Sequence, residues 1–396
     1  MMGIPEHVFE HFDLHDAEVL GEQAYDIYRA MRDRCPVAHS DEYGGYYVIT
    51  RFQDVYDILH DPETFSSESI TIPPIPKEGP WIPIEIDPPM HGKYRQIILP
   101  LLSPQRVARF EPSTRQTAHE LIDAFIDRGT ADLATEYALP LPGVVLATLF
   151  DIPLEDRDWF QGLSFDVIHE VDDIGKKLKA SMDLSDYLRS MIEARRSSEA
   201  LGEDLMSIFL MAEIDGRPVT DDEAVSYGHI LLLAGHETTA SAIGNSLFYL
   251  ATHPEDRKKL CGDPALLSDA VEEFLRFESP VTMGRVVKRD VTLNGFNYKE
   301  GDIVCLVVGA ANRDGAEFEA PDECLFTRKP NRHIAFGAGV HRCVGSHLAR
   351  MELKVALEVL LERIPDFSIP SDGVVKHQVG HSRGKLALPV QFPPGG

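Results

Sequence analysis

The longest unbroken helical pattern of hydrophobic and polar positions in this chain runs from Asp221 to Thr252. It begins with a capping box, because Thr220 precedes three acidic residues and Glu223 stands three positions after the cap. The acidic side chains also lie at the positive end of the helix dipole. At ~1.5 Å per residue this helix is roughly 48 Å long. Since positions 230–234 are apolar on all sides, the pattern predicts a helix that passes through the core.

The rest of the pattern is helical in the middle of the chain and strand-like near both ends. Helical periodicity dominates from Ser103 to about Thr252, whereas prolines between Ser66 and Pro89 exclude regular helix and predict a long ordered loop. Strand character marks the segments 46–50, 286–293, 296 onward, 303–308 and 385–390, with a tight turn at Asn294-Gly295. We therefore expect a mainly α fold with small β-sheets. Its β-rich parts lie at about 37–52 and 285–308, with further C-terminal strands, and its helical part at about 103–280.

Composition and charge narrow the classes of function. The chain has 38 Lys and Arg against 64 Asp and Glu, a net charge of −26, which argues against binding of nucleic acid or of an anionic membrane surface. No run approaches the eighteen apolar residues of a spanning helix, and the N-terminal residues do not resemble a signal peptide. The five cysteines are scattered and form no CxxC pair. We expect one domain of residues 1–396 in a reducing, cytoplasmic setting.

A polar segment interrupts the apolar centre of the long predicted helix. Residues 235–239 read Gly-His-Glu-Thr-Thr, and a buried acid is costly unless it has a partner. One interpretation is a polar notch in which the hydroxyl groups bond carbonyls of the preceding turn. The other is a local distortion that opens a small cavity and places Glu237 and Thr238 there to deliver protons. The sequence leaves both open.

A cysteine near the C-terminus has the surroundings of a reactive thiolate. Cys343 follows the glycine-rich segment 336–342 and stands at the start of an amphipathic helix, where backbone N–H groups and the helix dipole favour the charged form. A thiolate of this kind suits a haem iron as an axial ligand. A dinucleotide loop is excluded because Arg342 replaces the third glycine of its motif. A zinc site with His341 and His347, or an inert buried cysteine, accounts for less of the segment.

Together these motifs resemble the cytochrome P450 superfamily. The segment from Phe336 to Gly345 matches the haem-binding pattern Phe-x-x-Gly-x-x-x-Cys-x-Gly in full. The segment 273–276 resembles the Glu-x-x-Arg helix, and 234–238 resembles the oxygen-binding groove of the central helix. His91 and Arg95, after Asp-Pro-Pro, resemble contacts to the haem propionates. The similarity covers essentially the whole chain.

The resemblance implies a haem b cofactor between the long central helix and the cysteine loop, with Cys343 as the iron ligand. By similarity, the other cofactor-binding residues are Phe336 near the sulfur, Gly345 of the same loop, and His91, Arg95, Arg285 and His341 at the propionates. It assigns proton delivery to Glu237 and Thr238, and a structural ion network to Glu273, Arg276 and Arg328. For His236, we expect packing behind the helix.

The resemblance also implies a monooxygenase that inserts one oxygen atom from O2 into a small, largely apolar substrate, with a terpenoid-like compound favoured. The walls of its pocket would be Ile70, Thr71, Ile72, Ile230, Leu233, Ala234, Val281, Met283, His381 and Ser382. Electrons would come from a ferredoxin or flavodoxin with an NAD(P)H-dependent reductase, docked near Arg106, Arg342 and Arg350. The alternatives are a haem-thiolate binding or gas-sensing protein without turnover, and a peroxide-driven hydroxylase.

Overall fold

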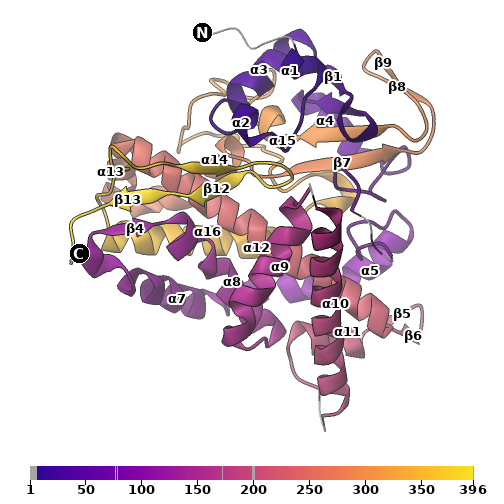
Figure 1. The fold of residues 1–396 in the computed structure, drawn as a ribbon, viewed down its shortest axis with the longest axis horizontal. Helices are drawn as coiled ribbons and strands as arrows, with labels where there is room; N and C mark the ends of the chain where they lie inside the picture. Colours follow the sequence, from indigo (N-terminus) through magenta and orange to yellow (C-terminus); the bar gives the residue numbers. More distant parts are fainter. Residues whose placement is uncertain (1–6, 76, 78, 172, 199–200, 396) are drawn as a thin grey trace.

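The computed structural model describes residues 7–75, 77, 79–171, 173–198 and 201–395. Within these ranges the fold is mainly α with small sheets, as the sequence predicts. Figure 1 shows a largely helical body below a smaller part in which N-terminal helices lie beside strands. The longer helices are α3 (Ala24–Arg34), α4 (Phe52–His60), α5 (Met90–Ile98), α7 (Glu111–Asp123), α8 (Pro140–Phe150), α9 (Arg157–His169), α10 (Ile174–Arg196), α12 (Asp221–Thr252), α13 (Pro254–Gly262), α14 (Leu267–Phe277) and α16 (Ser346–Arg363). Shorter ones are α1 (His7–Glu10), α2 (Ala17–Leu20), α6 (Pro104–Val107), α11 (Leu205–Met211) and α15 (Val308–Ala311).

The largest sheet combines strands from two distant parts of the chain. Its order is β1 (Val37–Ser40), β2 (Tyr46–Ile49), β10 (Ile303–Val307), β7 (Thr282–Val287) and β3 (Phe65–Ser66). β2 and β10 are parallel, and the other neighbours are antiparallel. The two-stranded sheets are β11 (Lys376–Gln378) with β12 (Gly384–Ala387), β13 (Pro389–Gln391) with β4 (Thr130–Asp132), β5 (Glu213–Ile214) with β6 (Arg217–Pro218), and β8 (Val291–Leu293) with β9 (Phe296–Tyr298).

The central helix α12 has the bounds that the sequence predicts. The Thr220 hydroxyl accepts a hydrogen bond from the Glu223 N–H at 3.2 Å, and the Glu223 carboxylate accepts one from the Thr220 N–H at 2.9 Å. The Arg217 guanidinium also bonds this carboxylate and lowers the pKa of Glu223 to about 2. α12 contacts α8, α9, α10, α14 and α16, so it lies in the middle of the helical part (Figure 1). None of the described helices is both long and apolar enough to cross a membrane.

Three sequence predictions of secondary structure are wrong in part. The expected strand 286–293 is two strands, because β7 ends at Val287 and β8 begins at Val291. The predicted turn at Asn294-Gly295 is present, and both residues have positive φ. The helical part contains β4, which pairs with C-terminal β13, and the β5–β6 hairpin. The β-rich part does not reach residue 52, because α4 begins there.

Candidate active site

The cysteine loop, residues 336–345, contains the short helix η7 (Gly339–His341) and leads to the start of α16. Its two bends place Gly337 and Gly339 at φ +67° and +65°, which is left-handed backbone that favours glycine. The Cys343 N–H donates to the Phe336 carbonyl at 2.8 Å and closes the loop. A Cβ at position 339 would lie 2.2 Å from the Leu59 carbonyl oxygen, so glycine lets the loop pack against the end of α4. The chain therefore holds Cys343 in a defined position.

The electrostatics of Cys343 correct one expectation. Part of the Cys343 surface is accessible to solvent, but many protein atoms lie around the thiol beyond its immediate contacts. Burial raises the pKa of the Cys343 thiol, and this outweighs the opposite effects of the Gly345 N–H and of Arg95. The helix start alone does not produce a free thiolate. A metal cation at the sulfur would displace the proton.

A cluster of cationic and histidine side chains lies close to the cysteine loop. His91 and Arg95 come from α5, Arg285 from β7 and His341 from η7, and the rings of His91 and His341 are 4.1 Å apart. The buried Arg285 guanidinium donates to its neighbouring Gly284 carbonyl and has no ion pair within the described residues. His91 Nε2 is buried without a hydrogen-bond partner.

The chemistry of this cluster fits an anionic ligand. Burial lowers the pKa of Arg285 to about 10, with Asp87 acting in the opposite direction. Burial and then the nearby charges of His91, Arg285 and Arg95 lower the pKa of His341 to about 3. Buried positive charge without a counter-charge is costly. A cofactor with two carboxylates, such as haem, would neutralise the cluster and bring a metal to the thiol.

The ion network expected between α14 and the following loop is present as a set of contacts. Glu273 receives bidentate bonds from Arg276 at 2.7 and 2.9 Å, and Arg328 Nε lies 3.1 Å from both carboxylate oxygens. Glu273 and Arg276 are fully buried. The sequence analysis missed Asn331, whose amide donates to the same carboxylate at 3.0 Å. A buried carboxylate with this many donors stays in place only while the network is complete.

The polar segment of α12 combines features of both sequence interpretations. α12 is continuous through 235–239, so no break in the helix occurs there. The Thr238 hydroxyl donates to the Ala234 carbonyl at 2.8 Å, as the polar-notch interpretation expects. Glu237 is 2% exposed, and its Oε2 accepts from Gln378 Nε2 at 3.1 Å and lies 3.3 Å from His169 Nε2. His169 and Gln378 were not found from sequence, because they lie 68 and 141 residues away from Glu237.

His236 packs behind the helix, as expected. Its ring is fully buried, and Nε2 donates to the Leu139 carbonyl, 3.0 Å away, at the start of α8. The Nδ1 atom has no hydrogen-bond partner and lies 3.8 Å from Glu237 Oε1. Because Nε2 carries the proton, Nδ1 is an acceptor.

The structure joins three of the segments predicted to line the pocket. The Gly284 N–H bonds the Ile70 carbonyl at 2.8 Å, and the Thr282 N–H bonds the His381 carbonyl at 3.0 Å. The Ile72 N–H donates to His381 Nε2 at 2.9 Å, and Val281 bridges Ser382. The remaining members of that set differ in exposure: Thr71, Ile230 and Leu233 are buried, while Ala234 and Met283 are partly exposed.

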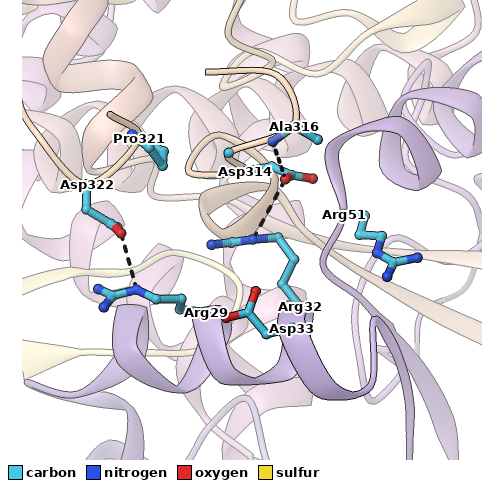
Figure 2. Close-up of a pocket in the computed structure, with 9 residues that line it drawn as sticks. Arg29, Arg32, Asp33, Arg51, Asp314, Ala316, Pro321 and Asp322 are labelled. Carbon is cyan, nitrogen blue, oxygen red and sulfur yellow. Dashed lines mark hydrogen bonds and ion pairs between the residues drawn. The ribbon is translucent and has the colours of Figure 1, made fainter. Parts of the chain in front are cut away.

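Two cavities lie outside this predicted set. One, of about 480 Å³, lies beside α3 and is lined by Arg29, Arg32, Asp33, Arg51, Asp314, Gly315, Ala316, Pro321 and Asp322. Two of its arginines face carboxylates (Figure 2): Arg29 pairs with Asp322 at 3.2 Å, and Arg32 with Asp314 at 3.9 Å. The other, of about 610 Å³, is lined by Thr135, Leu139, Pro140, Arg157, Asp158, Gln161, Gly162, Phe165, Asp166 and Glu237.

Comparison with known proteins decides the family. The family model described as Cytochrome P450 matches residues 47–263 and 264–379. The chain belongs to the cytochrome P450 family. This P450 is 36% identical to "Probable cytochrome P450 127A1" of Sinorhizobium fredii, with 86% of this chain and 82% of the relative covered. It is 34% identical to "Vitamin D(3) 25-hydroxylase" of Pseudonocardia autotrophica, with 94% of each covered.

Solved structures agree with this assignment. The P450 is similar to the crystal structure of CYP109E1 from Bacillus megaterium in complex with testosterone, with a TM-score of 0.86 and 30% identity. That similarity covers 93% of this chain and 97% of the other. As a member of this family, the P450 is an oxidoreductase of the monooxygenase class. The expected fold class is confirmed.

Proposed function

We propose that this P450 inserts one oxygen atom from O2 into a small, largely apolar substrate. When bound, haem b would supply the oxygen activation, with Cys343 on the iron and His91, Arg95, Arg285 and His341 at the propionates. The observation that carries this proposal is the buried Arg285, which forms no ion pair within the described residues, in the same cluster as a cysteine held at a helix start. By similarity, Phe336 would limit water near the sulfur. Its ring packs against Arg350.

The ligand is tested by Cys343→Ala. We expect the variant to lose the red-shifted Soret band of the reduced carbon monoxide complex, because the thiolate is the strong donor that shifts this band. Arg342→Ala, at an exposed neighbour in the same loop, is the matched control and should keep the band. Retention of the band in Cys343→Ala would remove Cys343 from the mechanism.

Glu237 and Thr238 would hold and pass the protons that oxygen cleavage consumes. Burial raises the pKa of the Glu237 carboxyl, but the hydrogen bonds from His169 and Gln378 help to hold it below its usual value. Thr238 keeps a hydroxyl on the neighbouring position, bonded to the Ala234 carbonyl. With Thr238→Ala we expect more reducing equivalents to leave as peroxide and fewer to appear in product.

The same experiment separates the alternatives. A haem-thiolate sensor without turnover has no need for an acid and an alcohol at these positions. It would form no product in the wild type or in Thr238→Ala. A peroxide-driven hydroxylase would form product from peroxide alone, and Thr238→Ala would leave that reaction unchanged. Product measured against NAD(P)H consumed distinguishes all three.

We propose a terpenoid-like substrate with few oxygen functions, because the expected walls from the 70–72 loop, β7 and α12 are mostly apolar. One similar protein is a vitamin D(3) 25-hydroxylase, and one similar structure is a complex with testosterone. The proposed substrates therefore also include larger compounds with several rings. A panel of camphor, limonene, testosterone and vitamin D3 tests this by the high-spin optical shift. No shift with any of them would contradict an apolar pocket of this kind.

A separate ferredoxin or flavodoxin, with its NAD(P)H-dependent reductase, would supply electrons near Arg106, Arg342 and Arg350. Arg342 is exposed and could face an acidic partner. Arg350 contributes less than the sequence suggested, because Glu272 neutralises it through two bonds of 2.6 and 2.8 Å. Arg106 is half-buried and donates to the Glu203 carbonyl.

A further inference from the structure

The two carboxylate oxygens of Glu237 have different surroundings. Oε2 is held by His169, at the end of α9, and by Gln378, in β11. Oε1 is buried and has no hydrogen-bond partner in the part of the chain that the structure describes. Glu237 also lines the 610 Å³ cavity between α8, α9 and α12, which we call the Gln161 cavity. One oxygen is therefore anchored, and the other is available to a group in or beside this cavity.

Two more polar atoms lack hydrogen-bond partners among the described residues: one lines the same cavity, and the other lies close to Oε1. Gln161 Nε2, from α9, lines the cavity as a buried donor, with 8% of the residue exposed. His236 Nδ1 is an acceptor 3.8 Å from Glu237 Oε1. A buried donor and two buried acceptors are a set that water satisfies with two to four hydrogen bonds. The cavity is large enough to hold several waters.

The backbone makes room for this arrangement. A Cβ at Gly143, in α8, would lie 1.7 Å from Gln161 Nε2, so glycine at this position lets the amide reach inward. At Gly162, the next residue after Gln161, a Cβ would meet nothing within 4 Å. A side chain at position 143 would displace the Gln161 amide, whereas a side chain at position 162 would not contact it.

The outer part of the cavity is charged and reaches solvent. Arg157 pairs with Asp158 at 2.7 Å, and the Asp158 side chain is 79% exposed. Asp166 pairs with Lys176 at 2.7 Å on the same side of α9. Among the described residues, the charged and titratable groups that face Glu237 are thus His236 on its own helix and His169 and the Arg157–Asp166 face on α9, with the Gln378 amide on β11.

We infer that solvent protons reach Glu237 through the Gln161 cavity. Gln161 and His236 are positioning residues that hold water against Oε1, while His169 and Gln378 keep the carboxylate in place. Cavity water gives a proton to Oε1 and regains one from solvent, so the carboxylate becomes an acid. It returns to carboxylate when it passes the proton toward Thr238, and no electrons move in these steps. The inference rests on the proposed function of Glu237 in proton delivery.

The test replaces the amide by an apolar side chain of similar size, Gln161→Leu. A second variant, Gly143→Ala, displaces the amide without altering it, and Gly162→Ala is the matched control in the open space. All are measured as holoenzyme, with the panel compound that gives the largest high-spin shift. The readouts are product formed per NAD(P)H, the solvent isotope effect on kcat, and an infrared titration of the Glu237 carboxyl in the resting enzyme, referenced to Glu237→Gln.

We expect Gln161→Leu and Gly143→Ala to lower product per NAD(P)H by about threefold or more and to enlarge the solvent isotope effect. The pKa of the Glu237 carboxyl should rise, because the charged form loses a solvated partner. The Soret band and the high-spin shift should stay as in the wild type.

The inference is overturned if both variants match Gly162→Ala while Glu237→Gln still diverts electrons to peroxide. Protons would then arrive from the side of His169 and Gln378. Normal coupling in Glu237→Gln would instead remove the acid from proton delivery, and this inference with it. Neither result affects the assignment of the iron ligand, which the Cys343→Ala spectrum tests separately.

Discussion

Two glycines of the cysteine loop have similar backbone angles but different reasons to be glycine. Gly337 adopts φ +67°, and a Cβ there would meet nothing within 4 Å. Gly339 adopts φ +65°, and its Cβ would collide with the Leu59 carbonyl at 2.2 Å. Position 337 therefore requires only a left-handed bend, whereas position 339 also requires close contact between two backbones.

Alanine at each position separates the two requirements. Gly337→Ala should lower the free energy of unfolding by about 1–2 kcal/mol, the cost of left-handed backbone for an L-residue. Gly339→Ala should lower it more and also reduce haem content, because the loop before Cys343 must move away from α4. Thermal unfolding and the Soret absorbance per protein measure both effects. Equal losses in the two variants would show that the contact with Leu59 is unimportant.

At this scale the sequence identifies residues whose neighbours are local in the chain. Cys343 and the pair Glu273 and Arg276 follow from motifs shorter than a dozen residues. The surroundings of Glu237 could not be predicted, because His169 and Gln378 come from distant elements and carry no motif. The raised pKa of the Cys343 thiol also depends on burial by the whole fold.

At the scale of elements, α14 anchors the long irregular segment that leads to the cysteine loop. Arg276 donates to the carbonyls of Asn312, Pro321 and Glu323, in addition to Glu273. Arg328 donates to the carbonyls at 319, 320 and 323. The ion network thus satisfies backbone acceptors of a segment, 312–338, that contains no helix or strand.

Neutralising the centre of this network should be severe. Glu273→Gln should lower the free energy of unfolding by about 3–5 kcal/mol, because two buried guanidinium groups lose their counter-charge. Asp269→Asn is the control on the same helix, since its pair with Lys329 is solvent-exposed and worth about 0–1 kcal/mol. Denaturant unfolding of both holoenzymes compares them. A similar small effect in both would contradict the anchoring role of α14.

Secondary structure was predictable where a local signal marks the ends of an element. The bounds of α12 follow from its capping box and the proline after it. β4 was missed because it has three residues and depends on β13, more than 250 residues later. Strands this short are formed by their partners, whereas a capped helix is specified by its own residues.

At the scale of the whole molecule, burial keeps several histidines neutral. It lowers the pKa of His229 and His377 to about 4 and that of His381 to about 3. In the unfolded chain these side chains bind a proton near pH 6.5. Between that pH and the folded pKa values the unfolded state holds more protons, so acid stabilises it relative to the native state.

The free energy of unfolding should therefore fall as the pH drops below 6.5. Each such histidine contributes a slope of up to about 1.4 kcal/mol per pH unit. His381→Gln should make the slope between pH 6.5 and 5 shallower, since Gln can replace the bonds to Ile72 and Thr282 without titrating. His39→Gln, at an exposed residue, is the control. Denaturant unfolding across this range measures the slope, and an unchanged slope in His381→Gln would contradict the burial of that ring.

The order of strands in the five-stranded sheet has a consequence for synthesis on the ribosome. β2 pairs in parallel with β10, so an early segment of the nascent chain waits for a partner roughly 250 residues downstream. At ~5–20 residues per second this delay is about ten to fifty seconds. During that time the inner edge of the β1–β2 hairpin carries unpaired backbone groups. The earliest residues of this P450 thus reach their final pairing only after most of the helical part has been translated.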